Sequence, residues 1–451
     1  MLKTIFKSPA RATLLAFALM ILLGTILFML PQSSNSGSLG FIDALFTATS
    51  AVCVTGLSTI SVVNKLSHFG QLILIILIQS GGLGIMTIST LFLMAAGKRL
   101  SLLEYSAVQD TFVHDEVRSI PSVLKDIFFF TFVLEGIGAI LLFFCFKEDY
   151  TVEKAIYLSI FHSISGFCNA GFSLFNDSFS YYKNSWLLNL TICFLIIMGG
   201  VGFLVLSELK HYFKMKHRKL SRLSLHTKLV LSTTIILLII STLVILFMED
   251  SNTLANLSSP QKILVSFFQA VNSRTAGFNT VPIGNMANET LFILMILMFI
   301  GASPGSCAGG IKTTTFATLI LLGLSRLSGH ERPQIFNRSI SEKSIGKAIS
   351  ILIISVVVVF LGIMFLLMTE LGEVSHVQTQ GKFLELFFEV VSAFGTVGLS
   401  TGVTAGLSSV GKIIITCIMF IGRLGPLLVT MAISKTITLH YFYAEEDIMI
   451  G

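Results

Sequence analysis

Charged side chains are scarce in this chain of 451 residues. Asp, Glu, Lys and Arg make up only 12% of it, whereas 53% of the residues are hydrophobic. Soluble globular domains carry about 25% charged residues. This deficit argues against a soluble protein and indicates an integral membrane protein.

Motifs of enzymes and metal sites are also missing. The six cysteines lie in apolar or glycine-rich stretches, so the sequence indicates neither a disulfide framework nor a CxxC metal site. The nine histidines form no HExxH pair, and no GxSxG, Walker A or GxGxxG sequence stands between a strand and a helix. We therefore expect no enzyme, no covalently bound cofactor and no nucleic-acid partner.

Long apolar runs are what the sequence has instead. Each is long enough for the ~20 residues that a helix needs to cross ~30 Å of hydrocarbon. Five runs carry no charge, namely 12–30, 69–97, 184–207, 229–248 and 348–369. Three more carry one charge each, namely 127–146 with Glu135, 290–325 with Lys312 and 413–434 with Arg423. We predict an all-α membrane protein with eight transmembrane helices.

The distribution of basic residues predicts the orientation of these helices. The first apolar run resembles a signal peptide in following basic residues, but it is longer than the about 7 to 15 residues of a signal core and no small-x-small site closes it. Segments on the side of the N-terminus hold twenty Lys and Arg residues and the alternate segments hold eight. The positive-inside rule therefore places both termini in the cytoplasm. The basic run 210–228 either reflects this bias alone or adds a docking surface for an acidic partner.

One short motif recurs four times along the chain. Its copies are SAVCVTGLS (50–58), SGFCNAGFS (165–173), VNSRTAGFN (271–279) and SAFGTVGLS (392–400). They align on Gly56, Gly171, Gly277 and Gly398, and each copy has a Phe ten residues earlier. Self-similarity of this kind predicts a repeat architecture. We predict four tandem repeats, covering residues 1–97, 98–210, 211–325 and 326–451.

A short apolar segment precedes the glycine in every repeat. These segments, 42–52, 157–168, 263–273 and 384–395, are too short to span a membrane and too apolar for solvated loops. Non-helical backbone at membrane depth is tolerated only where protein buries it or water lines it. We therefore predict four re-entrant pore helices around one pore.

Such pore helices favour a cation. Their C-terminal carbonyls carry the negative end of the helix dipole, while Asp43 and Glu385, thirteen residues before their glycines, lie near the N-terminal ends. Glycine permits backbone angles that turn carbonyl oxygens toward the axis, where a ring of them replaces the hydration shell of an ion. Close helix packing is the alternative explanation for such glycines. The predicted selectivity filter comprises Val54, Thr55, Gly56, Asn169, Ala170, Gly171, Thr275, Ala276, Gly277, Thr396, Val397 and Gly398.

The predicted layout resembles the Trk/Ktr/HKT superfamily of potassium transporters. In that layout a spanning helix, a pore helix, a glycine-marked filter and a second spanning helix are repeated four times in one chain. The similarity is greatest to the KtrB type of bacterial membrane subunit and its KtrD variants. It implies potassium uptake, because all four filter glycines are present, with potassium held by filter carbonyls and sodium as a second cation. It also implies a homodimer in the cell membrane. The dimer would sit on a cytoplasmic nucleotide-binding ring of KtrA or KtrC type, with the tail 444–451 among the contacts.

The third inner helix is interrupted by FIGASPGSCAGGIKT (299–313). Pro304 lacks a backbone donor and each glycine costs about 1 kcal/mol in a helix, so we predict a loop here. A kink tolerated for packing is the alternative, as for GGLG (81–84) and GGVG (199–202). The resemblance implies a gate. Its predicted residues are Gly301, Ala302, Ser303, Pro304, Gly305, Ser306, Cys307, Ala308, Gly309, Gly310, Lys312 and Arg423.

Buried charges allow structural roles as well. Intramembrane cations usually face a cavity or a partner. Lys312 is expected either at the gate or bonded to carbonyls freed by the broken helix, and Arg423 at an electrostatic barrier. Glu135 is expected to make a hydrogen bond between helices, with a role in transport as the alternative, and Arg274 to point behind the filter toward acids. The alternative function is a secondary transporter for a small organic solute or another monovalent cation, with a site formed by the Gly/Pro breaks.

Overall fold

The computed structural model describes residues 9–35, 37–84, 120–214, 223–330, 332–375 and 377–425, and most of them are helical. The first repeat contains α2 (Pro9–Phe28), α3 (Phe41–Val52), α4 (Val62–Lys65) and α5 (His68–Leu83). The second contains α8 (Ile120–Phe146), α9 (Val152–Phe167), α10 (Trp186–Val201) and α11 (Phe203–Lys214). The third contains α12 (Leu225–Glu249), α13 (Ser259–Asn272), α14 (Asn288–Phe299) and α15 (Thr313–Leu327). The fourth contains α16 (Glu342–Glu370), α17 (Lys382–Gly395) and α18 (Ser409–Leu424).

Small elements complete the described part of the chain. An antiparallel hairpin of β1 (Gln334–Ile335) and β2 (Arg338–Ser339) pairs Gln334 with Ser339 between α15 and α16. The short 3-10 helices are η1 (Pro31–Ser33), η3 (Ile283–Asn285) and η4 (Thr404–Gly406). The remaining described residues form the connections between these elements.

Four of the described helices are long and apolar enough to cross a membrane by length and composition. They are Arg11–Phe28 of α2, Ser122–Phe146 of α8, Leu225–Glu249 of α12 and Glu342–Glu370 of α16. Each of them is the first long helix of its repeat. Large parts of the runs 69–97 and 413–434 lie outside the described residues, so the number of eight spans stays a prediction.

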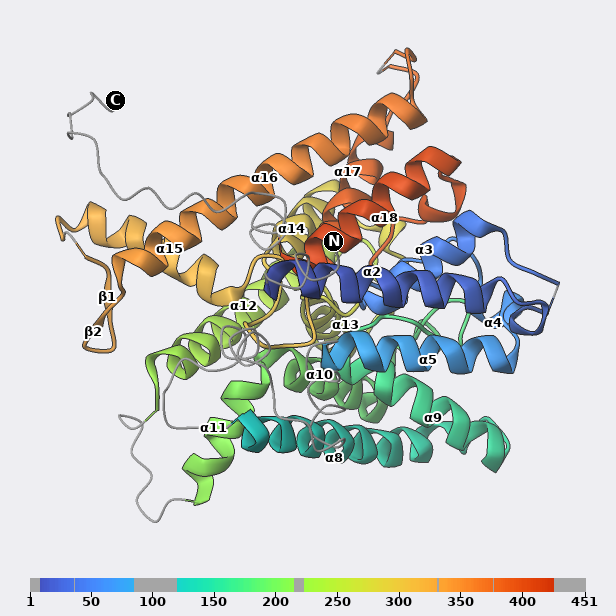
Figure 1. The fold of residues 1–451 in the computed structure, drawn as a ribbon, viewed down its shortest axis with the longest axis horizontal. Helices are drawn as coiled ribbons and strands as arrows, with labels where there is room; N and C mark the ends of the chain where they lie inside the picture. Colours follow the sequence, from blue (N-terminus) through green and yellow to red (C-terminus); the bar gives the residue numbers. More distant parts are fainter. Residues whose placement is uncertain are drawn as a thin grey trace.

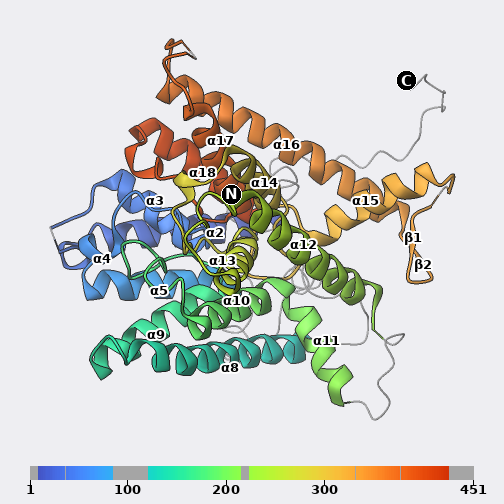
Figure 2. The ribbon, with the colours of Figure 1, turned by 180° about the vertical axis from the view of Figure 1, so that it is seen from behind.

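The repeats pack in a cyclic order. Within a predicted repeat the first helix packs on the predicted pore helix, as α2 does on α3 and α8 on α9. The inner helix then packs on the pore helix of the next repeat, in the pairs α5 with α9, α10 with α13, α14 with α17 and α18 with α3. Figures 1 and 2 show the short central helices α13 and α14 surrounded by longer ones such as α12 and α16. The last repeat therefore closes on the first.

Serine caps start three of the inner helices. The side chains of Ser67, Ser185 and Ser408 accept hydrogen bonds from the backbone N–H three residues later, which satisfies one of the free donors at a helix start. In the third repeat Ala287 occupies this place, and the carboxylate of Glu249 at the end of α12 accepts from its N–H at 2.9 Å. The inner helices thus begin at corresponding points.

The second inner helix is not a single straight run. The apolar stretch 184–207 was expected to form one span, but α10 and α11 meet at Gly202 with a bend of 99°. Gly202 has φ +98°, which other residues rarely adopt. The glycine motif 199–202 therefore ends α10.

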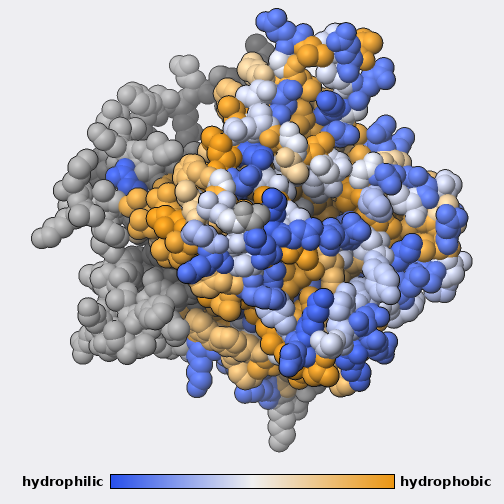
Figure 3. Space-filling model, turned by 90° about the vertical axis from the view of Figure 1, so that its right-hand side faces the viewer, coloured by the Kyte–Doolittle hydropathy of each residue, from blue (hydrophilic) through white to orange (hydrophobic). Residues whose placement is uncertain are grey.

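The pore helices also begin earlier than the apolar pattern predicted. Polar residues such as Glu153, Lys154, Gln261 and Lys262 form first turns that the pattern of apolar residues does not include. Figure 3 shows the end of the molecule that carries α4, with hydrophilic residues spread over its face between hydrophobic patches.

Candidate functional site

The four aligned glycines lie at the ends of the pore helices. Helices α3, α9, α13 and α17 stop three to five residues before Gly56, Gly171, Gly277 and Gly398. Asp43 and Glu385 lie in the first turns of α3 and α17, as expected from the dipole. All four helices therefore aim their C-terminal carbonyls at the same place.

The three residues that end at each aligned glycine (54–56, 169–171, 275–277 and 396–398) are called a strand below, although they form no β-sheet. Each of these strands has two residues in the left-handed region of backbone conformation. One is the aligned glycine, with φ between +67° and +94°. The other, two positions earlier, is a residue with a side chain, namely Val54, Asn169, Thr275 and Thr396 with φ of +56°, +60°, +78° and +50°. Such angles are strained for residues with a Cβ and persist where the surroundings impose them. The same backbone path therefore recurs in all four repeats.

The strands form a closed ring. A Cβ placed on Gly56 would lie 2.6 Å from the carbonyl oxygen of Ala170, and one on Gly171 would lie 2.6 Å from that of Ala276. Likewise, a Cβ on Gly277 would lie 2.5 Å from the oxygen of Val397, and one on Gly398 would lie 2.1 Å from that of Thr55. Each glycine thus abuts the carbonyl that precedes the glycine of the next repeat, in the order one, two, three, four, one.

Hydrogen bonds hold the strands from behind. The hydroxyls of Ser50 and Ser392 accept from the N–H groups of Gly56 and Gly398 at 3.0 and 3.1 Å. The third repeat has Val271 at this position, and there the amide oxygen of Asn272 accepts from Phe278 N–H at 3.1 Å. The repeats thus use different residues to hold the same backbone.

A wide cavity opens on one side of the ring. All four aligned glycines line it, and its volume is about 630 Å³. The residues two positions after each glycine, Ser58, Ser173, Asn279 and Ser400, also line it. The ring therefore forms the floor of an accessible vestibule.

The predicted loop connects α14 to α15. Helix α14 ends at Phe299 and α15 begins at Thr313, and an isolated bridge pairs Ile300 with Ile311. The N–H groups of Ser303, Cys307 and Gly310 donate to the carbonyls of Gly200, Gly199 and Gly422. Pro304, Gly305 and Ser306 are partly exposed, whereas most of the loop is buried. The loop is therefore fixed to the inner helices of two other repeats.

Two cations and one residue of the predicted filter contact this loop. Arg423 on α18 donates from its guanidinium to the carbonyls of Cys307 and Gly81. Lys312 Nζ donates to the carbonyl of Ala308 at 2.6 Å, a contact of the kind that its structural interpretation predicts. Gly309 N–H donates to the hydroxyl of Thr396 at 3.0 Å, so the loop of the third repeat touches the filter strand of the fourth.

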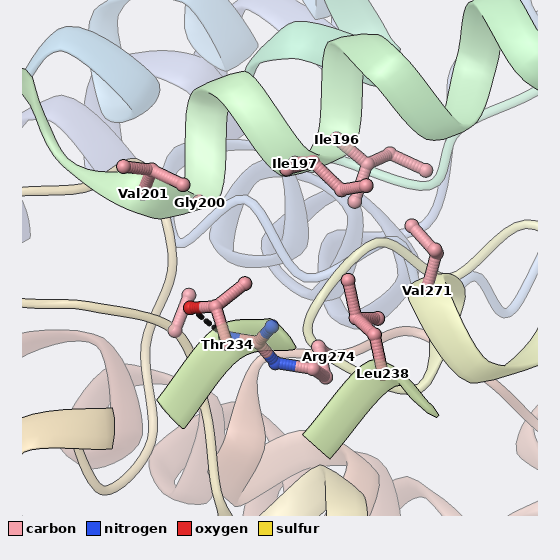
Figure 4. A pocket seen from close by; sticks show the side chains of 9 residues that line it. Ile196, Ile197, Gly200, Val201, Thr234, Leu238, Val271 and Arg274 are labelled. Carbon is pink, nitrogen blue, oxygen red and sulfur yellow. Dashed lines mark hydrogen bonds between the residues drawn. The ribbon is translucent and has the colours of Figure 1, made fainter. Parts of the chain in front are cut away.

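Arg274 lies away from the ring, at a small cavity between α10, α12 and α13. Figure 4 shows its side chain next to Thr234, to whose hydroxyl it donates at 3.5 Å. The cavity measures about 10 Å³, which is room for about one water molecule. None of the residues that line it is acidic, so the acidic partner expected for Arg274 is not found there.

Glu135 connects two helices behind the second strand. Gln79 on α5 donates to its carboxylate at 2.9 Å, and Ser163 on the pore helix α9 donates to its backbone carbonyl at 2.6 Å. This is the hydrogen bond between helices that the sequence led us to expect.

The motif GxxG marks close contacts between backbones in three inner helices, although the sequence interpretation considered only GGLG and GGVG, as kinks tolerated for packing. A Cβ on Gly81, Gly199 or Gly422 would lie about 2 Å from the carbonyl oxygens of Val52, Phe167 and Phe394 respectively, the residues four positions before the aligned glycines. Three residues later, α5, α10 and α18 end at glycines with positive φ, Gly84, Gly202 and Gly425. Aligning GGLG, GGVG and GRLG (422–425) would have revealed this feature.

Comparison with known proteins supplies the family. The model of the TrkH family, described as a cation transport protein, matches residues 13–439. The chain is 40% identical over its full length to the Ktr system potassium uptake protein B of Bacillus subtilis, with 98% of that protein covered. It is 36% identical over 98% of its length to the potassium/sodium uptake protein NtpJ of Enterococcus hirae, with 97% of that protein covered.

A solved structure supports the same conclusion for the fold. The potassium transporter TrkH from Vibrio parahaemolyticus aligns with a TM-score of 0.72 and 18% identity, covering 93% of this chain and 83% of that one. Together with the closed ring of four repeats, these matches show that the chain is a multi-pass membrane protein that belongs to the TrkH family of cation transport proteins.

Proposed function

We propose that this protein takes up potassium across the cell membrane through a selective pore, as the ion-translocating subunit of a Ktr-type system. The closed ring of four glycine-marked strands carries this proposal. Carbonyl oxygens arranged around an axis replace the hydration shell of a cation, and four helix C-termini add negative potential at the same point. The relatives named as potassium and potassium/sodium uptake proteins support potassium as the ion and sodium as a second one.

The filter in this proposal consists of the three residues ending at each aligned glycine. The cyclic packing of each inner helix on the pore helix of the next repeat supports four re-entrant pore helices within eight spans, divided into the four repeats 1–97, 98–210, 211–325 and 326–451. A two-half transporter for an organic solute would not need four equivalent units around one axis. Both termini face the cytoplasm, on the argument from basic residues.

The loop 301–310 acts as the gate in this proposal, together with Arg423. Its support is position: the loop contacts the filter through Thr396 and is tied to inner helices of two other repeats. A guanidinium near the path of a cation adds Coulomb repulsion, worth about 4 kcal/mol at 4 Å with an effective dielectric near 20. Lys312 lies where the loop joins α15, the second half of the third inner helix. In this proposal a regulator opens the gate by pulling on α15.

The partner in this proposal is a cytoplasmic nucleotide-binding ring of KtrA or KtrC type, on which a homodimer sits. Naming of relatives as parts of a Ktr system supports a second component. The tail 444–451, expected among the contacts, lies outside the described residues.

Growth of a host deficient in potassium uptake tests the function directly. Expression of the chain should restore growth on low potassium, and purified protein in liposomes should pass potassium down its gradient. The Gly398→Ser variant should restore growth poorly. Failure of the parent chain to move potassium in both assays, while correctly inserted, would overturn the proposal.

A further inference from the structure

Two buried polar residues occupy the same register of their pore helices, nine positions before the aligned glycine. They are His162 on α9 and Glu389 on α17, and neither side chain is accessible. The corresponding residues of the first and third repeats are Thr47 and Phe268. A buried polar group is retained where its hydrogen bonds are satisfied, so the partners of these two residues are informative.

Glu389 holds the stretch that follows the fourth filter strand. One carboxylate oxygen accepts from the hydroxyl of Ser400, and the other accepts from the hydroxyl of Thr404 at 2.8 Å. Ser400 lies two residues after Gly398, and its own oxygen accepts from Gly402 N–H at 2.9 Å. A buried carboxyl group thus connects the pore helix to the outer end of the filter.

His162 makes the equivalent contact in the second repeat. Its Nδ1 lies 2.8 Å from the carbonyl of Leu158, which only accepts, so Nδ1 carries the proton. Its Nε2 accepts from Leu174 N–H at 3.2 Å and lies 3.1 Å from the hydroxyl of Ser173, two residues after Gly171. The ring is stacked on Phe175 with centroids 4.8 Å apart. A neutral imidazole therefore fills the role that a carboxylate fills in the fourth repeat.

The other two repeats lack this connection at the same register, although in the first repeat Asp43, four residues earlier on α3, accepts from the hydroxyl of Thr59 at 2.7 Å. Thr47 donates to the carbonyl of Asp43 in its own helix at 2.7 Å, and Phe268 has no polar atom in its side chain. Ser58 and Asn279, two residues after their glycines, donate only to nearby carbonyls, those of Ile60 and Val281. Since the ring runs in chain order, the second and fourth strands face each other across the axis.

We propose that His162 and Glu389 are positioning residues that hold the outer ends of two opposite filter strands and thereby set the discrimination between potassium and sodium. This inference rests on the proposed function. A ring that prefers the larger ion must resist contraction around the smaller one, and both residues bind the strands from the outside of the ring. Ser173 and Ser400, which they hold, line the vestibule at its floor.

The test compares potassium and sodium flux into liposomes for Glu389→Ala, Glu389→Gln, His162→Phe and Ser400→Ala. His162→Phe places in the second repeat the residue type that the third repeat already has at this register. We expect Glu389→Ala to lower the potassium-to-sodium flux ratio about tenfold, the effect of losing the buried hydrogen bonds to Ser400 and Thr404. Glu389→Gln keeps an acceptor oxygen and should recover most of the ratio. Adding Ser400→Ala to Glu389→Ala should cause little further loss, because the two variants remove the same bond.

Thr47→Ala is the matched control, since it removes a hydroxyl at the same register that does not touch a filter strand. An unchanged flux ratio in Glu389→Ala and His162→Phe, or an equal loss in Thr47→Ala, would overturn the inference. If Glu389→Ala cannot be purified folded, Ser400→Ala at the partly exposed end of the bond decides the matter. A parent chain that passes no potassium would instead refute the proposed function, so the two failures are distinct.

Discussion

Gly398 is the aligned glycine with the tightest surroundings. A Cβ there would lie 2.1 Å from the carbonyl oxygen of Thr55, and φ is +88°. We predict that Gly398→Ser weakens the preference for potassium over sodium at least as much as the same change at Gly56, Gly171 or Gly277. Competition between the two ions in uptake assays measures this. Gly406→Ser is the control, because a Cβ at Gly406 meets no atom within 4 Å. Unchanged preference in all four filter variants would remove the filter assignment.

Asp43 forms an ion pair between the first pore helix and the last inner helix. Lys412 Nζ lies 2.9 Å from its carboxylate, and Thr59 donates to the same oxygen at 2.7 Å. Burial raises the pKa of Asp43, but the bonds from Lys412 and Thr59 outweigh it, so its pKa is below the ordinary value of 3.8. A carboxyl with a lowered pKa stabilises the fold above its unfolded pKa, and this contribution is lost as the pH falls through its folded pKa.

We therefore predict a difference between the parent and Asp43→Asn that depends on pH. The parent should be more stable at neutral pH, by about 1 kcal/mol or less because the pair is partly exposed. This advantage should disappear as the pH falls below about 4. Thermal unfolding in detergent at a series of pH values measures it. A constant difference at every pH would show that the ion pair does not contribute.

Sequence reasoning placed both the glycines and the residues two positions earlier in the predicted filter, but it did not predict the positive φ of the latter. The glycines recur as one residue type, whereas Val54, Asn169, Thr275 and Thr396 share only a backbone angle. That angle is imposed by the ring, so it has no signature in residue type. The same holds for His162 and Glu389, whose common role is to accept a hydrogen bond and whose side chains differ.

The loop between α14 and α15 is the element on which gating depends in our proposal. Arg423 donates to the loop carbonyl of Cys307, and Gly310 donates to Gly422 beside it. We predict that shortening residues 301–310, or replacing Arg423 with Gln, raises potassium flux and reduces dependence on the cytoplasmic ring. Filter selectivity should change little. Flux into liposomes without the ring is the measurement.

Arg326→Gln provides the control for this experiment. Arg326 is an exposed cation near the end of α15, away from the loop contacts. The Arg326→Gln variant should pass potassium at the same rate as the parent. If neither gate variant conducts better than the parent while remaining folded, the interruption between α14 and α15 is only a structural accommodation.

Of the two interrupted inner helices, the sequence predicts the break in the third but not the bend in the second. Pro304 and four glycines make a helix unfavourable there whatever surrounds it. The bend of 99° at Gly202 has no proline, and a glycine alone is tolerated in many helices. Its cause is tertiary, because Gly199 and Gly200 accept hydrogen bonds from the loop of the third repeat.

The assembled molecule is predicted to be a dimer that binds a separate ring. Purification in mild detergent should give twice the mass of one chain, and the protein should bind a nucleotide-binding ring of KtrA or KtrC type. Light scattering during size-exclusion chromatography, with and without the ring, measures both. A monomer with no affinity for any such ring would contradict this prediction.

The arrangement of the four repeats around one axis follows from the sequence, because four equivalent units that each supply one re-entrant segment can share a pore only in this way; their order around the axis comes from the structure. The contacts between units could not be predicted in the same way. For example, α18 packs on α3, and the residues that meet there are more than three hundred positions apart. No motif shared by the two segments indicates this contact in the sequence.

The ring is built from one chain, and this has a consequence for how its ion preference can evolve. In a channel of four identical subunits, one altered codon changes all four sides of the pore together. Here the same event changes a single quarter, and the remaining three keep their geometry. Selection can therefore adjust ion preference in small steps. It can also give one quarter a task of its own, as the contact between Thr396 and Gly309 on the fourth side illustrates.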